Sequence, residues 1–405
     1  MYLLGLLSFR RHLRLPILLT ALAAFVIGNS VSPAQAPAPA ASSAPPAHVA
    51  DVLQPFADDH TFAGAVVLVA DKTKILDAGA VGYADLANKK PMDPNDEFWI
   101  ASMSKAMTAA ATMMLVDEGK VHLDDPVEKY LPEFQGQMLV DPKDPTHTPK
   151  KPSHPITVRE ILSHSSGLPF KSAVEKGALD QLPLKDAVAS YAKTPLVFEP
   201  GTSFLYANAG INTAGRIVEV VSGMPYEDFM NQRLFTPLGM KDTTFWPNDE
   251  QVSRLAKSYK LNATKDGLEE LNITQLTYPL TDHTHRYPMP AGGLFSTAAD
   301  VSKFCQMILN KGVGPGGTRL LSEEAIKQMT TKQTAPSVVT PYAFGLDVGM
   351  GHIVHNGAYG TSMRMDPKLG FVAVFMVQYA GKFPNGADGK ITSAYMKGAA
   401  ALVKK

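Results

Sequence analysis

Two stretches of the chain, one near each end, have the apolar patterning of paired β-strands. Ala63–Gly82 contains two β-branched runs around Asp71-Lys72-Thr73, which predicts a hairpin. Tyr359–Gln378 contains a second pair, divided by the turn-forming residues Asp366-Pro367-Lys368-Leu369-Gly370. Because most of the material between these stretches has helical patterning, we expect one antiparallel sheet closed by the two ends of the chain, with a helical lobe inserted.

Helices are predicted over His48–Phe56, over the apolar segment Phe98–Gly119 and over Ile391–Lys404, whereas the Pro-rich Gly136–Pro155 is expected to be a surface loop. The predicted fold class is α+β: an antiparallel β-sheet flanked by helices, with a mainly helical lobe. The sheet lobe would span about 46–119 and 286–405, and the helical lobe about 120–285. A cleft between the lobes is the expected site of function.

The first 45 residues read as a signal peptide and a tether. Arg10 and Arg11 precede the apolar run Leu15–Ile27, small residues follow, and Pro33–Ala47 is rich in proline and alanine. We therefore expect an exported protein, periplasmic or extracellular, by a general or a twin-arginine route. The alternative is an uncleaved N-terminal anchor, which is the only membrane contact expected.

Composition narrows the function classes. The 405 residues carry 38 Lys and Arg against 38 Asp and Glu, so the balance of charge offers no attraction to nucleic acid. The single cysteine, Cys305, allows no internal disulfide and is expected to be a small core residue.

One apolar segment carries a single charge. Between Ser102 and Asp117, Lys105 is the only charged residue. A helix that is apolar all round is buried, and burial lowers the pKa of a lysine. Because Ser102 and Lys105 share one helix face, a neutral amine would be able to take the proton of the serine hydroxyl. The alternative is that Ser102 caps the helix while Lys105 reaches the surface.

Other segments offer partners for this pair. Tyr206 and Asn208 precede a helix expected near Gly210, on a loop that could face a cleft. His355 and Gly357 enter a predicted strand, where glycine lets another backbone or a substrate come close. Taken alone, Tyr206 reads better as a half-buried aromatic residue and His355 as a histidine at a strand edge.

In order, Ser102-x-x-Lys105, Tyr206-x-Asn208 and His355-x-Gly357 resemble the three motifs of the serine β-lactamase and penicillin-binding protein superfamily, in its class C-like branch. The segments LSHSSGLP (162–169), FEPGT (198–202), PLGM (237–240) and PAGGLFSTAADVSKF (290–304) strengthen the resemblance. It extends from about His48 to the end of the chain.

The resemblance implies an acyl-enzyme mechanism without metal or cofactor. Ser102 would attack a carbonyl with Lys105 as base, and Tyr206 would relay the proton to the leaving group. Asn208, His355 and Gly357 would bind the substrate. The backbone N–H groups of Ser102 and Ala358 would form the oxyanion hole.

One position departs from the class C pattern, which has lysine where this chain has His355. Histidine is mostly neutral at pH 7, so attraction to a substrate carboxylate would be weakened or made pH-dependent. We therefore expect a carboxylesterase or D-amino-acid peptidase acting on a small ester, a peptide or a β-lactam. The alternatives are a DD-carboxypeptidase acting on cell-wall peptides, a weak class C-like β-lactamase, and a non-catalytic peptidoglycan-binding module.

Two histidine-containing segments are set aside. Asp282, His283 and His285 could ligate a metal, but a loop bordering the cleft is the better reading. His164 is expected to be a structural loop residue, since Lys105 already fills the role of base.

Overall fold

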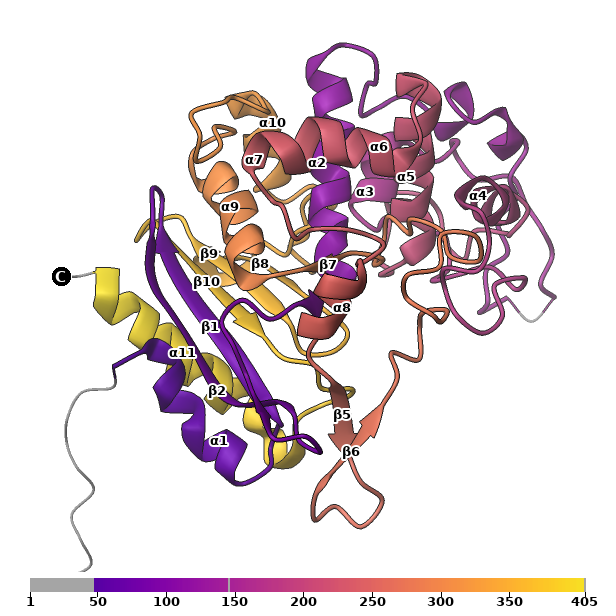
Figure 1. Ribbon diagram of the computed structural model, residues 1–405. Helices are drawn as coiled ribbons and strands as arrows, with labels where there is room; N and C mark the ends of the chain where they lie inside the picture. Colours follow the sequence, from indigo (N-terminus) through magenta and orange to yellow (C-terminus); the bar gives the residue numbers. More distant parts are fainter. Residues whose placement is uncertain (1–46, 145, 404–405) are drawn as a thin grey trace, which may run out of the picture. The chain divides into compact units, whose positions relative to one another are not determined.

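The computed structural model describes residues 47–144 and 146–403, which are built around one six-stranded sheet (Figure 1). Its strand order is β3-β2-β1-β10-β9-β8, with every neighbouring pair antiparallel. The strands are β1 Gly64–Asp71, β2 Ile75–Asp85, β3 Lys90–Pro91, β8 Ile353–Asn356, β9 Ser362–Asp366 and β10 Phe371–Met376. Because β1 pairs with β10, the predicted closure of the sheet by the two ends of the chain is confirmed.

Two aspartates make the predicted hairpin turns. The carboxylate of Asp71 accepts backbone hydrogen bonds from Thr73 and Lys74 at 2.6 and 2.8 Å. The carboxylate of Asp366 does the same for Lys368 and Leu369, at 2.9 and 2.8 Å. An aspartate that binds backbone N–H groups two and three residues ahead favours a tight turn, so each hairpin forms at the predicted place.

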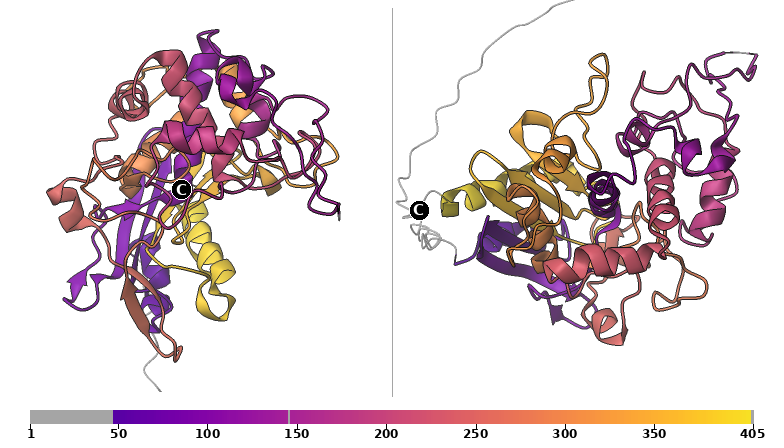
Figure 2. Two further views of the ribbon diagram at one scale, coloured as in Figure 1. Left: turned by 90° about the vertical axis from the view of Figure 1, so that its right-hand side faces the viewer. Right: turned by 90° about the horizontal axis from the view of Figure 1, so that it is seen from above.

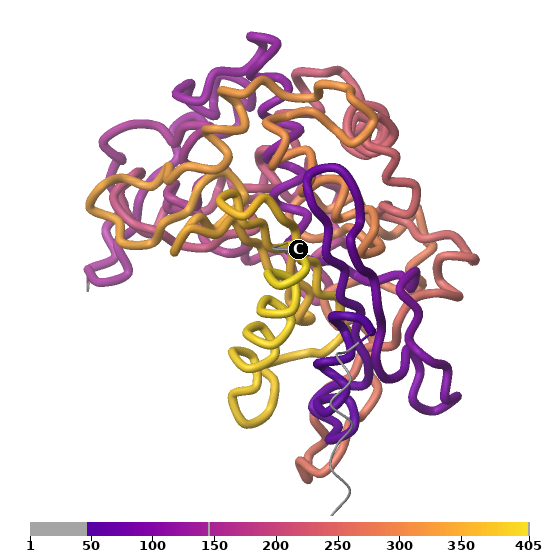
Figure 3. Tube along the Cα trace, turned by 90° about the vertical axis from the view of Figure 1, so that its left-hand side faces the viewer, coloured from indigo at the N-terminus to yellow at the C-terminus, as the bar shows by residue number. Residues whose placement is uncertain are grey.

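One face of the sheet is covered by the ends of the described chain. The 3₁₀ helix η1 Val49–Leu53 and helix α1 Gln54–Asp58 replace the single helix predicted over His48–Phe56. The C-terminal helix α11 Ala387–Val403 begins four residues before the predicted start and packs against η1 (Figure 3). Val49, Leu53, Phe375 and Tyr395 are among the buried residues of this layer.

The other face carries α9 Ala298–Leu309, and beyond it lie α2 Ser104–Asp117 and the helices packed around α5 Asn208–Ser222 (Figure 2). Short strands add β4 Phe98–Trp99 paired with β7 Phe295–Ser296, and β5 Ser258–Leu261 paired with β6 Leu268–Leu271. The remaining helices are η2 Ala101–Met103, η3 Val127–Lys129, η4 Pro132–Phe134, α3 Val158–Leu162, α4 Leu184–Ala192, α6 Tyr226–Met230, the π-helix η5 Asn231–Phe235, α7 Thr236–Leu238, α8 Asp249–Arg254, α10 Glu323–Met329, η6 Gly349–Gly351 and η7 Pro384–Gly386.

Several other predictions can be compared with these elements. The described residues of 136–155 contain no helix and no strand beyond isolated bridges at Leu139 and Lys150, as expected for the Pro-rich loop. Cys305 is fully buried in α9, and burial raises the pKa of its thiol, which agrees with a core role. The predicted signal peptide and tether, residues 1–45, lie outside the described residues. The division into sheet and helical lobes stays a prediction, and β5 and β6 fall within its helical part.

The helices of residues 47–144 and 146–403 include none that is both long and apolar enough to cross a membrane.

Candidate active site

Ser102 lies in a strained turn between a strand and a helix. Strand β4 ends at Trp99, and its pairing with β7 fixes the point from which the turn begins. Ala101 has a φ of 45°, which a residue with a Cβ rarely adopts. Ser102 then sits in η2, and the α-helix begins only at Ser104. The serine is therefore not inside the predicted α-helix but in the 3₁₀ turn that precedes it. Its side chain is half-buried.

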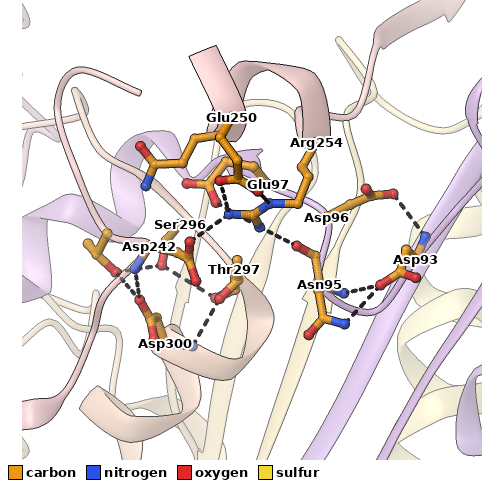
Figure 4. A network of polar contacts seen from close by, with 12 residues as sticks. Asp93, Asn95, Asp96, Glu97, Asp242, Glu250, Arg254, Ser296, Thr297 and Asp300 are labelled. Carbon is orange, nitrogen blue, oxygen red and sulfur yellow. Dashed lines mark hydrogen bonds and ion pairs between the residues drawn. The ribbon is translucent and has the colours of Figure 1, made fainter. Parts of the chain in front are cut away.

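A buried carboxyl group lies at the base of this turn (Figure 4). Glu97 directly precedes β4, is fully buried, and neither carboxyl oxygen has a hydrogen-bond partner among the described residues. Burial raises its pKa to about 9, so Glu97 is protonated at pH 7. Arg254 lies 3.9 Å away but is bound more closely, at 2.6 Å, by both Asp242 and Glu250. No motif in the sequence pointed to Glu97.

Lys105 is fully buried on α2, as the sequence predicts, and burial lowers its pKa well below the usual 10.5. Its Nζ lies 3.0 Å from Oγ of Ser102. A hydrogen bond of 2.6 Å to the carbonyl oxygen of Ala291 holds the amine in place. A neutral amine that donates to this carbonyl keeps its lone pair free for the serine proton, which is the property a base needs.

Tyr206 completes the group around the serine. It lies on the loop before α5, and its ring centroid is 4.7 Å from Lys105 Nζ. Burial raises the pKa of the phenol, so Tyr206 is neutral at pH 7. A neutral phenol beside Lys105 is suited to give a proton to a leaving group and to take one back.

His164 supports this loop. Its Nδ1 accepts a hydrogen bond from the backbone N–H of Ala207 at 3.3 Å, and its ring packs 4.6 Å from that of Tyr206. Burial lowers its pKa well below 6.5, so the ring is neutral. These contacts fit the structural role predicted for His164.

Asn208 is the first residue of α5, which begins two residues before the predicted position. Its side chain is buried, and its Oδ1 has no hydrogen-bond partner among the described residues. A buried amide oxygen without a partner is costly, so the site offers an acceptor that a bound N–H donor would satisfy.

His355 lies within β8, near its end, rather than at the entrance to a strand as predicted. Its Nδ1 is 2.9 Å from the carbonyl oxygen of Asn356 and must donate to it, so Nε2 accepts from the hydroxyl of Tyr342 at 3.1 Å. Burial, with the nearby Lys105, lowers the pKa of His355 to about 3. The ring is neutral and both nitrogens are occupied, which fits the weakened attraction to a substrate carboxylate expected from the sequence.

Gly357 brings the end of β8 against the nucleophile turn. A Cβ at this position would lie 2.7 Å from the carbonyl oxygen of Ile100, two residues before Ser102, so only glycine fits. The next residue, Ala358, is exposed, and its backbone N–H has no backbone partner among the described residues. The N–H of Ser102 lies in the first turn of a helix, where such groups lack intrahelical partners. The close contact of Gly357 with Ile100 therefore brings the backbone N–H groups of Ser102 and Ala358 into the same region of the fold. Their role as an oxyanion hole stays a prediction.

A cavity of about 450 Å³ opens beside these residues. Its mainly apolar lining includes Phe204, Tyr206, Tyr342, Val354, His355 and Arg364. Tyr342 was not among the residues predicted from the sequence, because the segment around it carries no motif. The cavity provides space for a substrate group beside Tyr206 and His355.

The loop set aside as a weak metal candidate has other contacts. The carboxylate of Asp282 accepts hydrogen bonds from Thr284 and lies 2.6 Å from Nδ1 of His285, while His283 stacks on Trp246 at 4.8 Å. Within the described residues, no three His, Cys, Asp or Glu side chains are grouped in a way that could hold a metal ion.

Comparison with known proteins agrees with this geometry. The sequence profile of the Beta-lactamase family matches residues 49–394. Protein Rv1367c of Mycobacterium tuberculosis is 30% identical over 361 residues, which cover 80% of this chain and 87% of that protein. Penicillin-binding protein 4 of Amycolatopsis lactamdurans is 31% identical over 294 residues, covering 69% of this chain and 71% of that protein.

A solved structure shows the same fold. EstCE1, a hydrolase with promiscuous acyltransferase activity, superposes with a TM-score of 0.71 at 25% sequence identity, over 88% of this chain and 97% of its own. Together with the family profile, this confirms the α+β fold class and the resemblance drawn from the three motifs. The chain therefore belongs to the beta-lactamase family, and it is a serine hydrolase.

Proposed function

We propose that this protein hydrolyses small carboxylic esters through an acyl-enzyme on Ser102. The observation that carries the proposal is the 3.0 Å approach of Lys105 Nζ to Ser102 Oγ, with the amine fully buried and its pKa lowered. An amine in that state is a base for the hydroxyl at neutral pH. EstCE1, a hydrolase with promiscuous acyltransferase activity, is a precedent for acyl chemistry on this fold.

In the first half-reaction, Ser102 Oγ attacks the carbonyl carbon while its proton passes to Lys105. The carbonyl oxygen becomes an oxyanion, which the N–H groups of Ser102 and Ala358 would stabilise. As the bond to the leaving group breaks, Tyr206 donates its proton to the departing oxygen and recovers one from Lys105. In the second half-reaction, water attacks the acyl group and gives its proton to Lys105, which returns it to Ser102 Oγ as the bond from that oxygen to the acyl group breaks.

Two features favour esters over β-lactams. His355 is neutral and buried, so the fixed positive charge that lysine supplies at this position in class C β-lactamases is missing. Attraction to the carboxylate of a β-lactam is then weaker at this point of the site. The mainly apolar cavity beside Tyr206 suits an uncharged acyl or alcohol group.

Amides such as D-amino-acid peptides are the second candidate. Asn208 carries a buried Oδ1 without a partner among the described residues, and a substrate amide N–H would satisfy it. The similarity to Penicillin-binding protein 4 is a reason to test cell-wall peptides as substrates as well.

The deciding experiment measures hydrolysis of 4-nitrophenyl butyrate, of nitrocefin and of a D-alanyl-D-alanine peptide by the protein and by Ser102→Ala. We expect serine-dependent ester turnover well above nitrocefin turnover. Peptide turnover above ester turnover would move the assignment to a peptidase. Ester turnover that persists in Ser102→Ala, or no turnover of any substrate, would overturn the proposal and favour a non-catalytic binding module.

We also propose that the protein is exported, on the strength of the basic, apolar and small-residue pattern of its first 36 residues. The mass of the protein recovered from the cell exterior or periplasm tests this. Cleavage between about residues 36 and 40 is expected, and a full-length, membrane-bound product would instead mean an uncleaved anchor.

A further inference from the structure

The backbone that anchors Lys105 is held in turn by a side chain of another helix. Nζ of Lys105 donates to the carbonyl oxygen of Ala291 at 2.6 Å. The backbone N–H of the same Ala291 donates at 3.0 Å to Oδ1 of Asn212, on α5. Ala291 and Asn212 are both buried, with exposed fractions of 1% and 3%. The position of the carbonyl that orients the amine therefore depends on Asn212.

Asn212 is fixed by two further buried groups. Its Nδ2 donates at 3.0 Å to the hydroxyl oxygen of Tyr191, on α4, and that hydroxyl donates at 2.7 Å to Oε1 of Glu175. The other carboxyl oxygen of Glu175 accepts from the backbone N–H of Ser172, also at 2.7 Å. Tyr191 is fully buried and Glu175 is 5% exposed. We refer to Asn212, Tyr191 and Glu175 as the Asn212 network.

Glu175 sets the direction of the hydrogen bonds in the Asn212 network. A carboxylate accepts hydrogen bonds and donates none, so the hydroxyl of Tyr191 must give its proton to Glu175. The oxygen of that hydroxyl then accepts from the amide NH₂ group of Asn212, which leaves Oδ1 of Asn212 facing the N–H of Ala291. If the amide were reversed, its NH₂ group would oppose the N–H of Ala291, and two buried donors would meet without an acceptor.

One loop supports both the Asn212 network and the start of α5. Residues 170–175 include Glu175, and the carbonyl oxygen of Phe170 accepts the backbone N–H of Asn208 at 3.1 Å. Asn208 and Asn212 lie one helical turn apart, so their side chains share a face of α5. The loop therefore holds this helix at the candidate substrate-binding residue and, through the network, at the support of the base.

We propose that Asn212 is a positioning residue for Lys105, acting through the backbone of Ala291, and that the rest of the network keeps its amide in the required orientation. This inference rests on the proposed function, in which Lys105 takes the proton of Ser102. Without the network the Ala291 carbonyl shifts, and the amine loses its fixed position 3.0 Å from Ser102 Oγ. The chemical step then slows, while substrate binding is retained, because no side chain of the network lines the cavity beside Tyr206.

The first test measures kcat and KM for 4-nitrophenyl butyrate in Asn212→Leu, which keeps the size of the side chain and removes its hydrogen bonds. We expect kcat to fall roughly 10- to 100-fold while KM stays within about twofold. Asn212→Asp keeps an oxygen that accepts from Ala291 and should restore part of kcat. Thr213→Val removes a buried hydroxyl that donates to the carbonyl of Ala209 on the same helix, and it is the matched control. It should leave kcat unchanged, whatever its effect on resistance to urea.

Two milder variants test the orientation of the amide, and they keep the inference testable if Asn212→Leu does not fold. Tyr191→Phe and Glu175→Gln should each lower kcat, but less than Asn212→Leu. Once Tyr191→Phe has removed the hydroxyl, Glu175→Gln should have no further effect on kcat, because no contact then joins Glu175 to Asn212. Independent effects that multiply in the double variant would overturn the network. An unchanged kcat in Asn212→Leu, or an equal fall in Thr213→Val, would overturn the positioning role of Asn212.

A labelling measurement separates this inference from the choice of substrate. A fluorophosphonate probe reacts with an activated serine: Ser102 Oγ would bond to phosphorus, fluoride would leave, and Lys105 would take the proton. The second-order labelling rate constant should fall in Asn212→Leu and stay unchanged in Thr213→Val. Equal labelling of the parent protein and Asn212→Leu would overturn the network alone. A parent protein without Ser102-dependent labelling would overturn the activation of Ser102, and with it both the proposed function and the network.

Discussion

The hydroxyl of Tyr342 donates a 3.1 Å hydrogen bond to Nε2 of His355, while Nδ1 of the same ring lies 2.9 Å from the carbonyl oxygen of Asn356. The two contacts fix one neutral tautomer, because Nδ1–H must donate to the carbonyl oxygen and Nε2 then accepts from the hydroxyl. His355 is thus a structural part of the cavity lining beside Tyr206, rather than a charge for the substrate.

This arrangement predicts that His355 does not titrate near neutral pH. Burial lowers its pKa to about 3, so the imidazole should stay neutral throughout the range in which the protein is folded and active. Assigned ¹⁵N spectra of the histidine ring nitrogens, recorded from pH 4.5 to 8.5, should show one protonated and one unprotonated nitrogen at every pH. A midpoint between pH 6 and 7 for His355 would contradict the predicted environment.

Lys105 should act as a base at a pH well below its ordinary pKa. Because burial lowers the pKa of the amine far below 10.5, kcat/KM for a neutral ester should reach its plateau well below that pH. Lys105→Arg keeps a cation that does not lose its proton and should lower kcat/KM roughly 100- to 10,000-fold. Exposed Lys120→Arg is the matched control and should behave as the parent protein. A rate that keeps rising through pH 10 would show that the amine is charged in the free enzyme.

The sequence allowed the central part of this site to be predicted, because its signals are local. A single charge in an apolar helix marks Lys105, and short motifs mark Tyr206 and Asn208. Tyr342, the hydrogen-bond partner of His355, could not be predicted. It lies in an irregular segment, and only the folded structure places this segment against the edge strand β8, which carries His355.

Glu97 could not be predicted for a similar reason. In the sequence it stands in an acidic stretch that reads as surface, and only the packing of β4 against β7 and α8 buries it. The hairpins, in contrast, follow from aspartates that bond within their own turns, so their positions matched the prediction.

Gly357 should tolerate no side chain. A Cβ would approach the carbonyl of Ile100 to 2.7 Å, and the backbone on either side is fixed by the turn and by β8. Gly357→Ala should therefore shift the nucleophile turn, lower ester turnover at least tenfold and reduce stability by roughly 1–3 kcal/mol. Gly316→Ala, where an added Cβ would meet open space, is the matched control and should change neither property. Normal activity of Gly357→Ala would mean that the end of β8 can move without shifting the turn that holds Ser102. Urea titration of the same variants measures the change in stability.

Glu97 should make the stability of the protein fall as pH rises. Its pKa is raised from 4.5 to about 9 in the folded state, so between these values the folded protein holds a proton that the unfolded chain has released. The stabilisation is complete below pH 4.5 and is lost as pH rises through 9. Within this window the free energy of unfolding should decrease by up to about 1.4 kcal/mol per pH unit from this group.

Glu97→Gln removes the titrating proton while keeping the shape of the side chain, so its stability should depend less on pH than that of the parent protein. The measurement is the difference in unfolding free energy between the two proteins, from urea titrations at pH 6, 7, 8 and 9, which cancels the contributions of other groups. As pH rises from 6 to 9, the unfolding free energy of Glu97→Gln should increase steadily relative to that of the parent protein. Glu250→Gln is the comparison variant. Glu250 is an exposed partner of Arg254, and the pKa of the Glu250 carboxyl is lowered, so its own titration should not change how the unfolding free energy depends on pH in this range. A constant difference for Glu97→Gln would mean that Glu97 is ionised in the folded protein, with Arg254 as its effective partner.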